Sequence, residues 1–329
     1  MTPNAVIQPK PGIGDVIWHL PFIRAIAAVS PGGKVTFLAP PTSNARELLA
    51  AEPAVAEVLY FNHFGSELQR AVNLIKLIAL LRRNHFRALW ILDRTIRPAL
   101  AGFLAGIPER IGVGFAPQRW FITNKGIDQS HFHDFPIDWL VALMADMQVR
   151  LPSTEPNLRI ASDLLAAVGN KFDACPRPWI VLGLGGSHPD KDWSTAYWVE
   201  FLGALRGLIT GTIFLIGGPA HVARAQTLIA DTAGANAINA CDLKVAESAA
   251  LLRHADLFIG TDSGPLNLAA ATGTEAFGLF GATPVLRYSK FIHAIVPEGG
   301  QAQNGMQRIL PAQVLEDVKP YLSQRKEQA

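Results

Sequence analysis

One stretch of the chain, residues 257–281, places a polar turn and an alanine-rich segment between two short apolar runs. The apolar runs read as buried strands and the alanine-rich segment as a helix, with Pro265 suited to its first turn because that position needs no backbone donor. Strand, turn, helix and strand form a βαβ unit, whose turn lies at the carboxyl edge of a parallel sheet, where ligands bind. Free N–H groups at the helix start attract an anion, although a buried turn of small residues can have the same sequence without a ligand.

Strands and helices alternate along the rest of the chain, which predicts an α/β fold with parallel sheets. The predicted strands are residues 5–7, 35–39, 55–61, 88–93, 110–113, 179–184, 212–216, 237–238, 257–261 and 276–280. The predicted helices are residues 15–29, 44–51, 67–83, 97–104, 195–206, 220–233, 245–254, 264–273 and 311–328. A chain of 329 residues fits two domains, and the turn-forming segment 151–156 reads as the approach to a linker. We therefore expect domains at 1–160 and 161–329.

The composition favours a folded protein with a large core, since 49% of the residues are hydrophobic and 17% are charged. Residues 1–160 carry 16 Lys and Arg against 12 Asp and Glu, which suits an anionic acceptor or an anionic membrane surface as well as chance scatter. Two distant cysteines, Cys175 and Cys241, indicate a reducing compartment. With no signal-peptide pattern and no apolar run long enough to span a membrane, we expect a cytoplasmic protein.

The first predicted strand is followed by a glycine turn that carries a carboxylate, Asp15, at the start of a helix. Gly12 and Gly14 begin a GxG pattern, but Ile17 stands where a dinucleotide fingerprint has its third glycine, which argues against a dehydrogenase. Asp15 is either a helix cap or a general base held at the edge of a cleft. Local sequence favours the cap.

Two clusters in the first half have structural alternatives. The basic residues that follow Leu81, from Arg82 to Arg87, satisfy a helix dipole or contact phospholipid or a phosphorylated acceptor. The segment from His131 to Asp134 resembles a metal cluster, but no second cluster accompanies it, so a polar loop facing a cleft is the better interpretation.

A second glycine turn, Gly185-Gly186-Ser187, follows a strand and offers backbone donors to phosphate oxygens. Lys191 adds a point charge suited to a diphosphate, although it can also pair with a neighbouring aspartate on the surface. The spacing is not that of a Walker loop. Asp190 and Asp192 form a DxD pattern, but the lysine between them disfavours a metal.

Three motifs, at residues 12–16, 185–193 and 262–269, occur in the order seen in glycosyltransferase family 9, the ADP-heptose:lipopolysaccharide heptosyltransferases. The chain resembles this family over nearly its whole length. The resemblance implies a GT-B fold, in which two Rossmann-like domains with parallel sheets face a central cleft. Residues 1–160 would bind the acceptor and residues 161–329 the nucleotide sugar, with the C-terminal helix crossing back to the first domain. It also implies inverting, metal-independent sugar transfer without a cofactor.

The resemblance assigns roles that agree with the chemistry. Inverting transfer needs a carboxylate that takes the acceptor proton, and Asp15 matches the family's base. Lys191 would stabilise the charge that develops on the leaving diphosphate, which makes it the second catalytic residue. The donor-binding residues are Gly185, Gly186, Ser187, Lys191, Thr261, Asp262, Ser263, Gly264, Pro265, Leu266 and Asn267. The acceptor-side residues are Gly14, Asp15, Arg97 and His131.

Two departures from the family lie on the donor side. Family members usually carry His where this chain has Asn267, and an acidic residue expected near His221 is replaced by Val222 or displaced. A nucleotide sugar remains the expected donor, and ADP-heptose is the first one to test.

The expected partners are thus a nucleotide sugar and an anionic glycolipid or oligosaccharide, such as a lipopolysaccharide core, with peripheral contact to the inner membrane surface. Two other hypotheses stay open: a sugar-nucleotide epimerase or hydrolase of the same fold, and a catalytically weak binding or scaffold protein of a surface-glycan pathway. Nucleic-acid binding is not expected, because the chain has no strong basic stripe and no recognised module.

Overall fold

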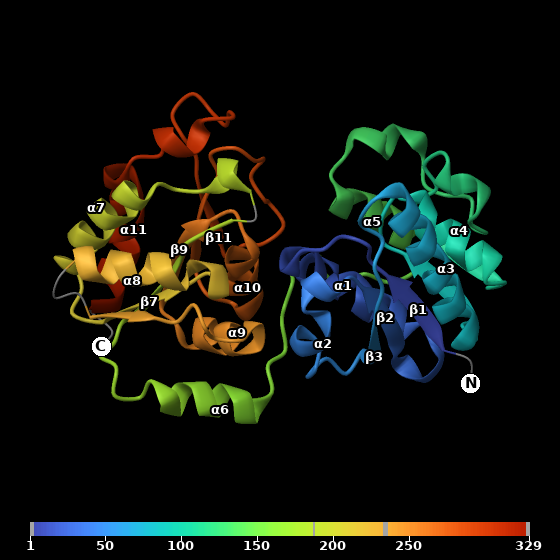
Figure 1. Cartoon of the computed structure of the whole chain (residues 1–329), viewed down its shortest axis with the longest axis horizontal. Helices are drawn as coiled ribbons and strands as arrows, with labels where there is room; N and C mark the ends of the chain where they lie inside the picture. The colour runs from blue at the N-terminus through green and yellow to red at the C-terminus, as the bar shows by residue number, and fades with distance from the viewer. Residues whose placement is uncertain (1–2, 187, 233–235, 327–329) are drawn as a thin grey trace. The chain divides into compact units, whose positions relative to one another are not determined.

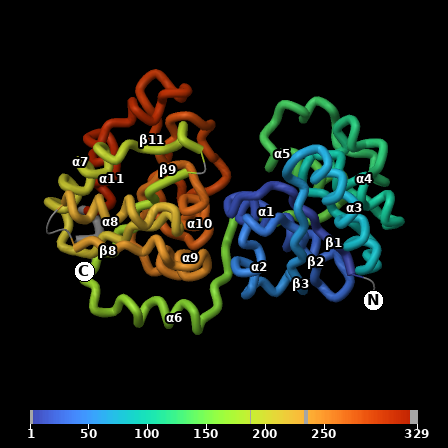
Figure 2. Tube along the Cα trace, viewed as in Figure 1, coloured from blue at the N-terminus to red at the C-terminus, as the bar shows by residue number. Residues whose placement is uncertain are grey.

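The protein is described by a computed structural model that covers residues 3–186, 188–232 and 236–326. It has an α/β fold with two parallel sheets, as predicted, and Figures 1 and 2 trace the two sheets along the chain from blue to red. The chain divides into two compact units, Met1–Pro156 and Asn157–Ala329. The division falls at the end of the turn-rich segment 151–156.

The first unit contains a parallel sheet of five strands in the order β3-β2-β1-β4-β5. The strands are β1 (Asn4–Ile7), β2 (Val35–Ala39), β3 (Val55–Tyr60), β4 (Ala88–Ile91) and β5 (Glu109–Gly112). β1, β2 and β4 are buried along their whole length, because helices cover both faces of this sheet. Continuous apolar runs, rather than alternating ones, are the sequence signature of such strands.

The helices of the first unit follow the strands. They are α1 (Ile13–Ala28), α2 (Ala45–Leu48), α3 (Glu67–Arg83), α4 (Ile96–Leu104) and α5 (Pro136–Asp146), with short 3₁₀ turns at Pro31–Gly33, Pro41–Ser43, Gln118–Trp120 and Gln129–His133. The helix predicted at 44–51 is limited to α2, and the chain turns before Pro53, whose ring disfavours helix in the residue before it. α5 was not predicted.

The second unit contains a parallel sheet of six strands in the order β11-β10-β9-β6-β7-β8. The strands are β6 (Trp179–Gly183), β7 (Thr212–Ile216), β8 (Ala237–Asn239), β9 (Leu257–Thr261), β10 (Ala276–Leu279) and β11 (Ile292–Ile295). β11 was not predicted. Its burial pattern shows why, because only Ile295 of its four residues is buried, so the strand lacks a continuous apolar run.

The helices of the second unit pack around a core rich in aromatic side chains. They are α6 (Ser162–Lys171), α7 (Thr195–Arg206), α8 (Val222–Asp231), α9 (Val245–His254), α10 (Gly264–Thr272) and α11 (Pro311–Lys326), with 3₁₀ turns at Pro189–Lys191, Pro219–His221 and Gly305–Arg308. α6 was not predicted. α11 packs against α7 of the same unit, and Val314, Val318 and Leu322 are buried in that core. A return of this helix to the first unit stays a prediction.

The two sheets share one topological feature. In the first unit the chain runs outward from β1 through β2 to β3 and then places β4 on the other side of β1. In the second unit it runs from β6 through β7 to β8 and then places β9 on the other side of β6. Each sheet therefore has a switch point, between β1 and β4 and between β6 and β9, and ligands bind at the carboxyl edge of such points. The motifs at 185–193 and 262–269 begin just after β6 and β9, and the motif at 12–16 follows β1 after a short loop.

No helix among the described residues is both long enough and apolar enough to cross a membrane.

Candidate active site

The switch point of the second unit brings together two of the sequence motifs. Lys191 lies in the turn after β6 and Asp262 in the turn after β9, and the Lys191 Nζ atom is 2.7 Å from Asp262 Oδ2. The surface alternative, in which Lys191 pairs with a neighbouring aspartate, is wrong, because β6 and β9 are adjacent and their turns meet. The side chain of Lys191 is 27% exposed and that of Asp262 11% exposed, so the pair is mostly buried.

Thr283 completes this cluster and was not predicted. Its hydroxyl donates a hydrogen bond of 2.6 Å to the same Asp262 oxygen that Lys191 contacts. Thr283 follows β10, the next strand of the sheet, so a polar residue just beyond a buried strand was the available signal. The lysine, the carboxylate and the hydroxyl hold one another in fixed positions beside the start of α10.

The start of α10 has the properties of an anion site. Ser263 precedes the helix in an extended conformation, and its side chain does not cap the helix. The hydroxyl oxygens of Ser263 and Thr261 are buried and have no hydrogen-bond partner among the described residues. Buried polar atoms usually have partners, and the first N–H groups of a helix favour negative charge. Two unpartnered hydroxyls and a helix N-terminus therefore lie together at this end of the sheet.

The glycine turn after β6 depends on the absence of side chains. A Cβ atom on Gly185 would lie 2.0 Å from His221 Nε2, and one on Gly186 would lie 3.0 Å from Lys191 Cβ. The His221 ring is held through Nδ1, 2.6 Å from the carbonyl oxygen of Gly217. Glycine at position 185 therefore lets the backbone lie against His221, and glycine at position 186 leaves room for Lys191. Ser187, predicted to bind the donor, lies outside the described residues.

The two aspartates of the DxD pattern have separate partners. Asp190 lies 3.4 Å from His188 Nδ1, and Asp192 Oδ1 accepts a hydrogen bond of 2.7 Å from Arg224. Arg224, which was not predicted, also donates to the carbonyl oxygen of Leu184, so it ties the loop to the end of β6. Among the described residues no group of three or more His, Cys, Asp and Glu side chains is arranged to hold a metal ion.

Trp193 anchors the loop after β6 to the core of the second unit. Its side chain is fully buried, its indole N–H donates to the carbonyl oxygen of Ile309 at 2.9 Å, and its ring packs edge-on against Trp198, with the two ring centroids 4.8 Å apart. A buried anchor two residues beyond Lys191 restricts where the lysine can reach.

The remaining residues predicted on the donor side lie in the first turns of α10. Pro265 occupies its first turn, and Leu266 is buried against Gly278 of β10. Asn267 is 7% exposed and donates a hydrogen bond of 2.9 Å to the carbonyl oxygen of Ser263. The Asn267 side chain thus braces the turn that carries Ser263 and Asp262.

The switch point of the first unit holds Asp15. Its carboxylate accepts a hydrogen bond of 3.1 Å from the backbone N–H of Gly12, so it caps the start of α1, and Gly14 lies in the same turn. The side chain is only partly buried and keeps a second carboxylate oxygen. The cap favoured by local sequence is present, and it leaves room for a second role as a base.

His19, one turn further along α1, joins this turn to the loop after β4. Its Nδ1 atom contacts the carbonyl oxygen of Asp15, and its Nε2 atom lies 3.1 Å from the carbonyl oxygen of Leu92. Burial lowers the pKa of His19, and the contact with the Asp15 carbonyl opposes this shift only in part. The buried His19 ring, with one nitrogen against each carbonyl oxygen, therefore links the Asp15 turn to the loop that starts at Leu92.

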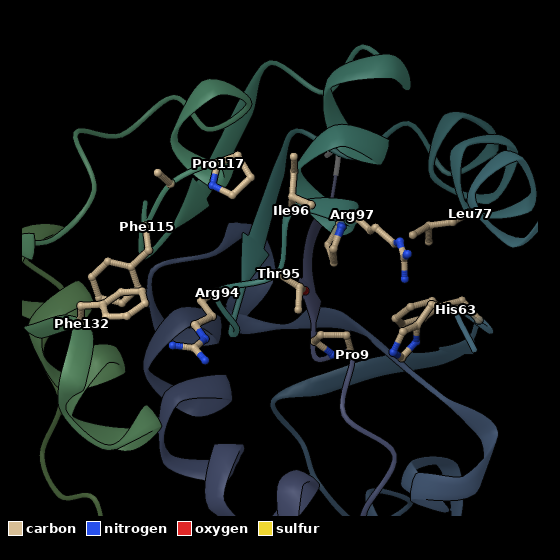
Figure 3. A pocket seen from close by; sticks show the side chains of 13 residues that line it. Pro9, His63, Leu77, Arg94, Thr95, Ile96, Arg97, Phe115, Pro117 and Phe132 are labelled. Carbon is tan, nitrogen blue, oxygen red and sulfur yellow. The ribbon is translucent and has the colours of Figure 1, made fainter. Parts of the chain in front are cut away.

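That loop lines a cavity of about 410 Å³ at the carboxyl edge of the first sheet (Figure 3). The walls are mostly apolar, and polar side chains enter from the loops after β3 and β4. The lining residues are Pro9, Phe61, His63, Leu77, Arg94, Thr95, Ile96, Arg97, Pro98, Phe115, Ala116, Pro117 and Phe132. Pro9 belongs to the loop between β1 and Asp15, so the cavity adjoins that loop.

Two arginines give the cavity a positive character. Figure 3 shows Arg97 and His63 directed toward one another, with Arg94 on the side of Phe132. The Arg94 guanidinium carbon lies 5.1 Å from the ring centroid of Phe132 and 5.2 Å from that of Trp139. Burial lowers the pKa of His63, and the nearby Arg97 charge lowers it further, whereas Asp93 opposes the shift. Of these cavity residues only Arg97 was predicted; Arg94 and His63 are recognised only once the strands are placed.

His131, predicted on the acceptor side, does not line this cavity. It pairs with Asp134 at 2.7 Å and lines a separate hollow together with Asp128 and Asp138. Its neighbour Phe132 is the residue that reaches the cavity wall.

Two parallel sheets, each with polar groups at its switch point, define the class of α/β proteins that bind nucleotides and similar ligands at strand ends. The model of glycosyltransferase family 9 (heptosyltransferase) matches residues 74–304, so the chain belongs to this family and is a glycosyltransferase family 9 enzyme.

Three relatives illustrate the similarity. The lipopolysaccharide core heptosyltransferase OpsX of Haemophilus influenzae is 22% identical over 85% of this chain and 79% of its own length. The ADP-heptose lipopolysaccharide heptosyltransferase II of E. coli has a similar fold, with a TM-score of 0.79 and 19% identity over 98% of this chain and 99% of that one. The E. coli heptosyltransferase WaaC, solved with ADP-2-deoxy-2-fluoro heptose, has a TM-score of 0.74 and 18% identity over 96% of this chain and 99% of that one.

Proposed function

We propose that this enzyme transfers a heptose from ADP-heptose, with inversion and without a metal, to an anionic acceptor of the lipopolysaccharide-core type. Family membership supports sugar transfer, and the relatives solved with ADP and an ADP-sugar analogue support the donor. The observation that carries the proposal is the Lys191–Asp262 contact, because it joins the two donor motifs at the switch point of the second sheet.

The donor role falls to the second unit. Lys191, the N–H groups at the start of α10 and the unpartnered hydroxyls of Thr261 and Ser263 provide a cation and several donors within one turn region. A diphosphate needs this combination, because its charge increases when the bond to the sugar breaks.

The acceptor role falls to the first unit. Asp15 is the carboxylate beside the cavity loop, and Arg94 and Arg97 supply positive charge in that cavity. Apolar walls lower the local dielectric and strengthen the attraction between a guanidinium and an anionic group of the acceptor.

The proposed reaction is a direct displacement at the anomeric carbon. Asp15 takes the proton of the acceptor hydroxyl while the hydroxyl oxygen forms a bond to the anomeric carbon. The bond from that carbon to the diphosphate oxygen breaks, and its electron pair leaves with ADP. Lys191 and the α10 N-terminus stabilise the departing charge, and attack from the opposite face inverts the anomeric configuration.

A mass-spectrometric transfer assay tests this function. The protein is incubated with ADP-heptose and a heptose-free lipopolysaccharide-core acceptor, and the acceptor is expected to gain the mass of one heptose. UDP- and GDP-linked sugars serve as matched donors and should give little product. Donor hydrolysis without transfer, or an epimerised donor, would replace the proposal with the hydrolase or epimerase reading. Nucleotide binding without turnover would favour a scaffold.

We also propose a cytoplasmic location. The support is the pair of free cysteines, Cys175 and Cys241, which are typical of a reducing compartment.

A further inference from the structure

Helix α3 has apolar side chains on two opposite faces. Leu77 and Leu81 are buried in the core of the first unit. Leu68, Val72 and Ile75 follow one another at spacings of four and three residues, which places them on one face, and they are 76%, 42% and 66% exposed. A helix that only covers a sheet has a polar outer face, so this second apolar stripe is not needed to pack α3 on its sheet.

The stripe continues beyond the helix start. Phe64, just before α3, is 47% exposed. A shallow groove of about 570 Å³ runs beside the stripe and is lined by Phe64, Leu68, Val72 and Lys76, among others. Contiguous exposed apolar surface of this kind marks an interaction site on a soluble domain, whereas single exposed apolar residues do not.

The charge around the stripe indicates its partner. α3 carries four basic residues, Arg70, Lys76, Arg82 and Arg83, against a single acidic one, Glu67, in its first turn. Lys76 and Arg83 are exposed and make no hydrogen bond or ion pair within the described part of the chain. Long basic side chains beside an apolar stripe can extend toward phosphate groups while their stems stay in contact with apolar surface. Apolar residues flanked by free cations complement a surface of anionic lipids.

We propose that this face of α3, made of Phe64, Leu68, Val72, Ile75, Lys76 and Arg83, docks on an anionic membrane surface. The apolar side chains enter the interfacial layer, and Lys76 and Arg83 contact lipid phosphates. Leu77 of the same helix lines the cavity that carries Arg94 and Arg97. Docking through α3 therefore brings the cavity wall close to a membrane, where a lipid-linked acceptor is held. This inference goes beyond the proposed function, because membrane binding is measured without donor or acceptor.

Vesicle co-sedimentation of the full chain tests the proposal. Vesicles of phosphatidylcholine with one third phosphatidylglycerol are compared with vesicles of phosphatidylcholine alone. The wild type should bind the anionic vesicles and bind the neutral ones at least about tenfold more weakly, because each basic side chain near an anionic surface contributes favourably. The double variants Leu68→Ser/Ile75→Ser and Lys76→Glu/Arg83→Glu should each lose about tenfold or more of this binding.

Leu310→Ser is the matched control, since Leu310 is 51% exposed in the other unit, and it should bind as the wild type does. Thermal melting and ADP affinity should stay unchanged in all three variants, which shows that they are folded. Absence of binding to anionic vesicles, or equal loss in the Leu310→Ser variant, overturns the proposal. So does a concentration-dependent dimer in sedimentation velocity that Leu68→Ser/Ile75→Ser abolishes while vesicle binding persists, because the face is then covered by a second copy. If the wild type transferred no heptose to a soluble acceptor, that result would instead contradict the proposed function.

Discussion

The two switch points handle charge in different ways, although each joins a lysine to an aspartate across its two central strands, Lys10 to Asp93 at 3.9 Å in the first unit and Lys191 to Asp262 in the second. In the second unit Lys191 already has an anionic partner, Asp262, at 2.7 Å, and Thr283 holds the same carboxylate. In the first unit Arg94 and Arg97 have no carboxylate within ion-pair distance among the described residues, and their cavity is mostly apolar. The contact with Asp262 fixes the position of Lys191 before the ligand arrives. In the first unit, the charges of Arg94 and Arg97 are left for the ligand to neutralise. We infer that the fixed position of Lys191 determines which donor binds, and that the positive charge of Arg94 and Arg97 determines which acceptor binds.

The largest expected effect separates the two roles of Asp15. Asp15→Asn keeps an oxygen that can accept the Gly12 N–H hydrogen bond but removes the base, so we expect the transfer rate to fall by about 10²–10⁴-fold with little change in stability. Asp15→Ala should lose the same activity and also destabilise the protein by about 1 kcal/mol through the lost cap. Initial rates and urea unfolding of the two variants provide the measurement. An active Asp15→Asn enzyme would leave the cap as the residue's function.

The next effect concerns the free positive charge of the first unit. Arg94→Gln and Arg97→Gln should each raise KM for an anionic acceptor by about 10–100-fold, the contribution of one hydrogen bond to a charged group. ADP affinity should not change. Arg119→Gln, at an exposed position in the same unit, is the control and should have no effect on KM. Equal effects of Arg94→Gln on acceptor KM and on ADP affinity would remove the distinction between the two sites.

A smaller effect is the dependence of stability on pH. Burial lowers the pKa of His19 below its ordinary value of 6.5, and burial also lowers the pKa of His63. Below pH 6.5 the unfolded chain therefore binds more protons than the folded one, and stability falls as the pH decreases. For one group the slope is at most about 1.4 kcal/mol per pH unit.

Urea unfolding at pH 5.5 and pH 7.5 measures this difference. His19→Gln should reduce it, while His133→Gln, at an exposed position, should not. An unchanged pH dependence in His19→Gln would show that this histidine is not held neutral between the Asp15 turn and the loop after β4.

The smallest effect is expected at Asn267, which braces the Ser263 turn through one hydrogen bond. Asn267→His introduces the residue that the family resemblance leads us to expect at this position. Because one net hydrogen bond contributes about 0.5–1.5 kcal/mol, we expect a change of a few-fold in affinity for the ADP-sugar and none for the acceptor. Calorimetry with ADP-, UDP- and GDP-sugars measures it. A switch in preferred base would show that this position selects the nucleotide.

The local sequence pattern was sufficient to predict the bounds of helices whose apolar residues recur at helical spacing and whose ends are marked by polar residues. α3, α7 and α9 begin and end where the sequence predicted, because each has apolar residues at helical spacing and begins just after a polar residue. α5 lacks such contrast, since apolar residues occupy most of its length and its start follows a histidine-rich turn. β11 was missed for the opposite reason, because only Ile295 is buried.

The site could be predicted as motifs but not as contacts. Local turns around Gly185 and Asp262 indicated two polar segments at strand ends, yet the pairing of Lys191 with Asp262 spans 71 residues and depends on the adjacency of β6 and β9. The nearer aspartates at 190 and 192 gave the wrong partner. Arg94 and His63 lie on separate loops whose meeting depends on strand order, so nothing local distinguishes them from surface residues.

The central claim is that the second unit holds the donor diphosphate through a pre-positioned lysine while the first unit does not contribute to that binding. Calorimetric titration of ADP into the wild type, Lys191→Ala and Arg97→Ala tests it most directly. We expect ADP affinity to fall by about 10–100-fold in Lys191→Ala, as for one hydrogen bond to a charged group, and to stay within twofold of the wild type in Arg97→Ala. Unchanged affinity in Lys191→Ala, or an equal loss in Arg97→Ala, would contradict the account.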